Sequence, residues 1–120
     1  MVQKIDIAGV HMQVGDDLKK YIFKKIGSLD RYVPRASRTS LHVEVKLKES
    51  NPRGKSERTC EIIMHLPHEV LNVKETTINI YAAVDIAEEK LKVQLKKYKD
   101  LHGTHGFRRR VLTRLKRSPA

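Results

Sequence analysis

Lysine side chains at helical spacing are the residues of this chain whose types and positions could do chemistry. Lys92, Lys96 and Lys99 recur at i, i+4 and i+7, which places them on one stripe of a helix. Lys90 and Lys97 fall on its other flank. Ammonium groups attract phosphate oxygens and donate hydrogen bonds to them, so these residues predict non-covalent binding of a polyanion.

A second basic set lies in the first third of the chain. Lys20, Lys24 and Arg31 project from the outer face of a predicted helix, and Lys25 lies at its flank near Tyr21. If the two helices lie side by side, their outer surfaces merge into one positive platform. Such a platform can follow the phosphates of a folded RNA without reading bases.

The overall charge agrees with that prediction. The formal net charge is +11 and the pI is near 10.0, which favours a nucleic acid or another anionic surface as partner. Residues 101–120 hold six basic residues and no acidic one. We expect residues 102–120 to form a flexible basic tail that adds Arg108, Arg109 and Arg110 to the RNA-binding set.

Individual lysines also have a simpler explanation. Acidic residues early in a helix and lysines late in it complement the helix dipole, and Glu88 can pair with Lys92 one turn on. Beyond Glu89, however, only Asp100 balances the lysines, and the tail has no acidic residue. The basic residues taken together therefore favour a functional patch.

No set of residues predicts catalysis. His65 and His68 flank a proline turn, so with Cys60 they make a weak metal-binding candidate. Cys60 is better explained as a small buried apolar residue and His65 as a solvent-facing strand residue. Because the chain has no phosphate-binding glycine loop and no nucleophile motif, we expect no enzyme, no cofactor and no metal.

The hydrophobic periodicity predicts the order β-α-β-β-β-α. The segments are a strand at 2–9, a helix from Gly15 to Val33 that Pro34 ends, strands at 41–48, 59–66 and 70–76, and a helix at 80–99. The first helix must be a crossover that returns the chain parallel to the first strand. We therefore expect an α+β domain over 1–101 in which a four-stranded mixed sheet carries both helices on one face, as in double-stranded-RNA-binding domains.

Several classes of protein are disfavoured. The lone Cys60 suits a reducing compartment, the charged N-terminus does not fit a signal peptide, and no segment could span a bilayer. The outward strand positions lack the aromatic residues that a single-strand RNA reader stacks on bases. We expect a cytoplasmic protein, monomeric when free, with no membrane or small-molecule partner.

One stretch resembles a known family. Ile80-Tyr81-Ala82-Ala83-Val84-Asp85, followed by Lys90-Leu91 and Gln94-Leu95, and Leu29-Asp30-Arg31-Tyr32 resemble the ribosome hibernation promoting factor family, whose members were once called sigma-54 modulation proteins. The resemblance covers roughly residues 2–100. It implies a non-enzymatic translation inhibitor that binds 16S rRNA of the small ribosomal subunit near the decoding centre, where mRNA and the A- and P-site tRNAs otherwise lie. It also implies that binding blocks initiation and protects idle ribosomes under stress or in stationary phase.

By position, the resemblance implies rRNA contacts for Lys25, Arg31, Lys90, Lys97 and Lys99, whereas Lys92 and Lys96 rest on periodicity alone. Three positions depart from the family pattern. Gly15 and Asn79 replace common helix caps, and Glu75 stands where a small apolar residue is usual.

Several alternatives remain open. The chain could be a short form or the N-terminal part of a long form, and could pair ribosomes or silence single ones. A generic double-stranded-RNA binder or a protein-interaction regulator with an incidental basic tail are the competing functions.

Overall fold

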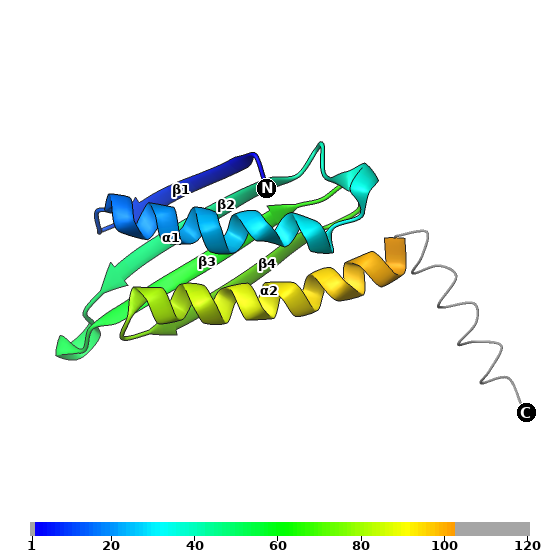
Figure 1. Cartoon of the computed structure of the whole chain (residues 1–120). Coiled ribbons are helices and arrows are strands. Elements are labelled where there is room, and N and C mark those ends of the chain that lie inside the picture. Colours follow the sequence, from blue (N-terminus) through cyan, green and yellow to red (C-terminus); the bar gives the residue numbers. More distant parts are fainter. Residues whose placement is uncertain (1, 103–120) are drawn as a thin grey trace, which may run out of the picture.

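A four-stranded sheet covered on one face by two helices makes up the computed structural model, which describes residues 2–102 (Figure 1). The strands are β1 (Lys4–Val10), β2 (His42–Ser50), β3 (Glu57–His65) and β4 (Val70–Thr77), and the helices are α1 (Asp16–Gly27) and α2 (Ile80–His102). The strands lie in the order β1-β2-β3-β4, with β1 parallel to β2 and the other pairs antiparallel. The predicted α+β fold is confirmed, including the crossover helix and both helices on one face.

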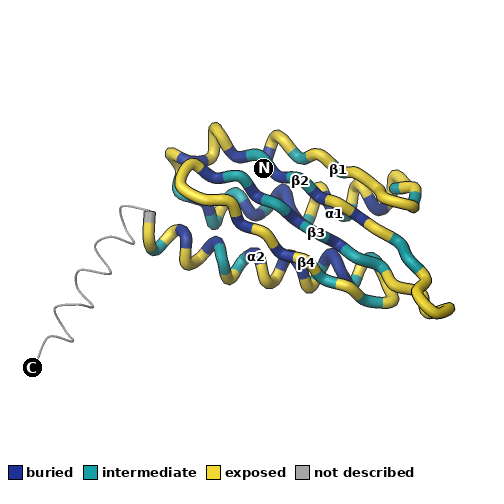
Figure 2. Tube along the Cα trace, turned by 180° about the vertical axis from the view of Figure 1, so that it is seen from behind, coloured by how far each residue is buried: buried dark blue, intermediate teal, exposed yellow. Residues whose placement is uncertain are grey.

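The core lies between the sheet and the helices because alternate strand residues point to that side. In the register, Ile7 of β1 lies beside Val45 of β2, which pairs with Ile62 of β3. Val45 and Ile62 are buried, whereas the alternate residues are partly or fully exposed. Figure 2 shows this uncovered face of the sheet from behind, with exposed and intermediate stretches along each strand.

The first helix is shorter than the sequence predicts. Leu18, Ile22 and Ile26 form its buried stripe, but α1 ends at Gly27 and the chain continues as a 3₁₀ turn, η1 (Ser28–Tyr32). The Ser28 hydroxyl donates a 3.0 Å hydrogen bond to the Lys25 carbonyl oxygen, which satisfies one carbonyl at the helix end. The prediction of one helix up to Val33 was wrong because a 3₁₀ turn also buries residues at that spacing.

The second helix begins at a side-chain cap. Asn79 Oδ1 accepts hydrogen bonds from the backbone N–H groups of Tyr81 (2.8 Å) and Ala82 (3.4 Å). Gly15, before α1, makes no such side-chain bond. The stripe of α2 is fully buried at Val84, Ala87, Leu91, Leu95 and Tyr98.

The second helix also runs further than predicted, to His102 instead of residue 99. Arg108, Arg109, Arg110 and the rest of the predicted tail lie outside the described residues. The boundary between the domain and the tail therefore stays a prediction. Neither helix within residues 2–102 is long and apolar enough to cross a lipid bilayer.

Candidate nucleic-acid interface

The two helices run side by side in the same direction across the sheet (Figure 1). Their C-terminal ends therefore lie at the same end of the molecule, where η1 contacts α2. Helix α1 has Asp16 and Asp17 in its first turn and Lys24 and Lys25 in its last, and every lysine of α2 follows Glu89. The arrangement brings the basic end of α2 next to the segment that carries Arg31.

Six of the predicted RNA-binding residues on these elements are exposed and have no acidic partner within residues 2–102. They are Lys20, Lys24, Arg31, Lys96, Lys97 and Lys99. The Arg31 guanidinium lies 5.1 Å from the centre of the Tyr32 ring, which holds its position without neutralising its charge. These six groups can therefore receive phosphate oxygens without first breaking an ion pair.

Three other predicted residues are paired with carboxylates. Lys25 Nζ lies 3.5 Å from Asp85 Oδ1. Lys92 Nζ lies 3.3 Å from Glu88 and 3.2 Å from Glu89, as the i, i+4 spacing of Glu88 and Lys92 predicted. The hydrogen bonds to these two glutamates raise the pKa of Lys92, so its ammonium group is held in the charged form.

The third paired lysine explains an unusual glutamate. Glu75 follows Leu71 and Val73 on the inner side of β4, and its side chain is 16% exposed. Lys90 reaches it from α2 and forms an ion pair. A carboxylate at this apolar position is thus compensated, and β4 continues to Thr77.

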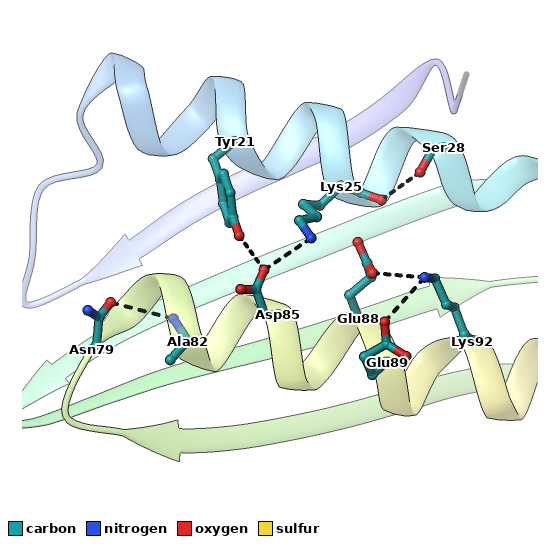
Figure 3. A network of polar contacts seen from close by, with 9 residues as sticks. All are labelled: Tyr21, Lys25, Ser28, Asn79, Ala82, Asp85, Glu88, Glu89 and Lys92. Atoms are coloured by element: carbon teal, nitrogen blue, oxygen red, sulfur yellow. Dashed lines mark hydrogen bonds and ion pairs between the residues drawn. The ribbon is translucent and has the colours of Figure 1, made fainter.

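Side chains along the line where the two helices meet, which we call the helix seam, join them: Tyr21, Lys25 and Asp85 (Figure 3), together with Tyr81. The Tyr21 hydroxyl donates a hydrogen bond to the same Asp85 oxygen that Lys25 approaches. The Tyr21 and Tyr81 rings meet edge to face, with centroids 5.0 Å apart. The hydrogen bond to Asp85, together with burial, raises the pKa of Tyr21 to about 12.

Two exposed arginines near the basic ends of the helices were not predicted from the sequence as part of the basic patch. Arg35 and Arg38 follow Arg31 at spacings of four and three, in the turn η2 (Arg35–Ser37) and directly after it. Figure 1 places this segment at the same end of the molecule as the C-terminus of α2. Their regular spacing after Arg31 was the signal, and they extend the basic end of the helical layer.

The uncovered sheet face carries charges of both signs. His42 Nε2 lies 2.7 Å from Asp6, and His65 Nε2 lies 2.8 Å from Glu44. The two histidine rings stack with centroids 5.3 Å apart. The hydrogen bond from His65 is the main reason that the pKa of Glu44 is lowered.

The weak metal candidate finds no support. Cys60 is fully buried, and burial raises the pKa of its thiol to about 12. His65 is engaged with Glu44. Within residues 2–102 no three His, Cys, Asp or Glu side chains are grouped so that they could hold a metal ion.

Comparison with known proteins gives consistent matches. Residues 5–102 match the family model described as "Sigma 54 modulation protein / S30EA ribosomal protein". Relatives named ribosome hibernation promotion factor, from Lactococcus lactis subsp. cremoris (strain MG1363) and Staphylococcus aureus (strain COL), are each 30% identical over 96 residues. These matches cover 80% of this chain and 49% and 48% of the two relatives, so the chain spans about half their length.

Solved structures show the same fold. The N-terminal domain of Protein Y from Thermus thermophilus superposes with a TM-score of 0.69 at 30% identity, covering 80% of this chain and 99% of that domain. A ribosomal subunit interface protein from Coxiella burnetii gives a TM-score of 0.65 at 23% identity over 81% of this chain and 98% of that one. At that identity the second likeness shows the fold alone.

Proposed function

Because this chain belongs to the sigma 54 modulation protein / S30EA ribosomal protein family, we propose that it is a ribosome hibernation factor that binds the small ribosomal subunit. It lodges in the channel for mRNA and tRNA, near the decoding centre at the A and P sites, and contacts 16S rRNA. Bound there, it blocks initiation and keeps ribosomes inactive under stress or in stationary phase. This role places it in the cytoplasm and needs no catalysis.

One observation carries the proposal: the two helices lie together on one sheet face, and their basic ends coincide (Figure 1). Lys96, Lys97 and Lys99 on α2 and Arg31 on η1 supply cations from two separate elements. A surface of this kind can bind RNA through phosphates and shape, because its cations follow the backbone without reading bases.

The proposed contacts differ in how readily they form. Lys20, Lys24, Arg31, Lys96, Lys97 and Lys99 bind phosphates directly, since none is ion-paired among the described residues. Lys25, Lys90 and Lys92 contribute to the same surface, but their ammonium groups are shared with carboxylates. Arg108, Arg109 and Arg110 add contacts from the tail.

Co-sedimentation with isolated small subunits tests the proposal. The protein should bind them and compete with initiator tRNA. With about 6–10 phosphate contacts, affinity should fall on the order of 10³–10⁵ between 50 and 200 mM salt. Undiminished tRNA binding at saturating protein would contradict occlusion of the channel.

Competition with a long RNA duplex distinguishes a hibernation factor from the alternative function, a general double-stranded-RNA binder. Helices on one face of a sheet also occur in double-stranded-RNA-binding domains, so a general RNA binder would bind duplex and subunit equally. We expect a clear preference for the subunit, because its channel walls can meet both helices at once. Equal affinities would favour the general binder.

A further inference from the structure

The helix seam holds an aspartate between the basic residues of α1 and those of α2. Asp85 lies on α2, is partly exposed, and faces α1 (Figure 3). A carboxylate repels phosphates, so at this place it weakens RNA binding unless it has another role. The two side chains that contact its carboxylate within residues 2–102, Tyr21 and Lys25, belong to the other helix.

The geometry at Asp85 is that of a two-point attachment. Tyr21 and Lys25 are four residues apart on α1, so both side chains leave the helix on the same face. Both meet the Oδ1 atom of Asp85, Tyr21 through its hydroxyl and Lys25 at 3.5 Å. Lys25 Nζ also lies 5.7 Å from the centre of the Tyr21 ring, and the Tyr81 ring of α2 packs edge to face against the same Tyr21 ring. These contacts restrain sliding and rotation of one helix against the other.

The two helices are anchored to different strands within one core. The buried residues of α2 pack on β3 and β4, whereas α1 contacts β1, η1 and α2 itself. The relative position of the two basic rows therefore depends on the contacts between the helices, to which the seam contributes the polar ones. Since RNA phosphates have fixed spacing, a change in that position would cost contacts from one row or the other.

We propose that Asp85, held by Tyr21 and Lys25, is a positioning residue that sets the spacing of α1 and α2 so that both basic rows engage one RNA surface. The inference rests on the proposed function. Asp85 itself does not contact RNA. Its negative charge is retained because the alignment of two rows of cations outweighs the repulsion of one carboxylate.

Two matched alanine variants separate a positioning role for Asp85 from that of a mere surface anion, because the two roles predict opposite changes in affinity for small subunits. Asp85→Ala and Glu89→Ala both remove one negative charge from α2 and both introduce a strong helix former. Glu89 is 70% exposed and shares Lys92 with Glu88, so its loss leaves the seam intact. If Asp85 were only a surface anion, both variants would bind small subunits more tightly.

We expect Asp85→Ala to bind small subunits on the order of tenfold more weakly, and Glu89→Ala to bind as tightly as wild type or more tightly. The salt dependence separates positioning from partial unfolding. Loss of one or two phosphate contacts lowers the slope of log K against log salt by about 0.9 for each contact. A simple loss of folded protein lowers affinity and leaves the slope unchanged.

Tyr21→Phe provides a variant without any change of charge. It removes the hydroxyl and keeps the ring against Tyr81, so it should reproduce part of the affinity loss. Combined with Asp85→Ala it should add little, because both changes break the same attachment. Additive losses would overturn the proposal.

A distance measurement tests the attachment without the ribosome. Spin labels on Lys20→Cys and Lys96→Cys report the separation of the helices, and Cys60 is buried with a protonated thiol and should not label. We expect a broader or shifted distance distribution in Asp85→Ala and an unchanged one in Glu89→Ala. An unchanged distribution in Asp85→Ala refutes the positioning role, whereas failure of the wild-type protein to bind small subunits refutes the proposed function.

Discussion

The helical layer and the uncovered sheet face both carry many charges, but they differ in how those charges are paired. On the sheet face, Asp6 meets His42 and Glu44 meets His65. At the basic end of the helical layer, Lys96, Lys97 and Lys99 form no ion pair within the described residues.

The difference follows from the geometry of the two kinds of element. Directly opposite residues on neighbouring strands stand about 4.5–5.5 Å apart, and diagonal neighbours are within reach of long side chains, so opposite charges on a sheet face meet easily. On a helix surface, a lysine needs an acidic residue three or four positions away. After Glu89, the only acidic residue of α2 is Asp100, so positive charge accumulates over the second half of that helix. We therefore expect the clustering of cations without acidic neighbours, more than their number, to decide which face can bind a polyanion.

Neutralising three lysines on one face at a time is the strongest test of whether the helical layer and the uncovered sheet face differ in RNA binding. Lys96→Gln, Lys97→Gln and Lys99→Gln together should weaken binding to small subunits on the order of 10²-fold, taking about 1 kcal/mol for each lost charged contact. Co-sedimentation at fixed salt measures the loss. The melting temperature should change little, because these side chains lie on the exposed side of α2.

The matched control removes the same charge from the sheet. Lys46, Lys48 and Lys74 are exposed on the uncovered face, and their triple glutamine variant has the same net charge as the helical one. We expect it to retain most of the affinity. Equal losses from both triples would mean that net charge alone drives binding and that the helical layer has no special role.

The elements of this fold could be predicted because their periodicities are local. The alternation of Val43, Val45 and Leu47 and the helical stripe of Leu91, Leu95 and Tyr98 are visible in one segment at a time. The Glu88–Lys92 pair was predictable for the same reason, since both residues lie on one helix.

The partners of Lys25 and Lys90 could not be predicted in this way. Asp85 is sixty residues from Lys25, and Glu75 belongs to a strand while Lys90 belongs to a helix. Such pairs depend on how elements are placed against each other, which local spacing does not specify. The sequence therefore predicted where the basic residues lie but not which of them are engaged.

A paired and an unpaired lysine on the same helix should differ in their effect on stability. Lys92→Gln leaves Glu88, whose side chain is 5% exposed, without its charged partner, and should lower the free energy of unfolding by about 1–3 kcal/mol. Lys96→Gln should change it by less than about 0.5 kcal/mol. Urea unfolding of the two variants measures both values, and equal effects would show that the Glu88–Lys92 pair does not stabilise the fold.

The smallest expected effect is a change with pH in the stability that the Glu44–His65 contact gives to the sheet face. Because the bond from His65 lowers the folded-state pKa of Glu44 below its ordinary value of 4.5, this contact stabilises the fold above that value and loses its effect as pH falls through the folded-state pKa. His65→Phe keeps a ring beside His42 and removes the hydrogen bond. The difference in melting temperature between wild type and His65→Phe should therefore be present at pH 6 and shrink below about pH 4.5.

A pH-independent contact on the same face provides the reference for that measurement. Thr59 and Thr76 share a 2.9 Å hydrogen bond between neighbouring strands, and neither side chain titrates in this range. Thr59→Val should lower the melting temperature by the same amount at pH 6 and at pH 4. If the His65→Phe difference is equally constant, Glu44 does not stabilise the sheet face through its charge, and the compensation of charges there is weaker than the geometry indicates.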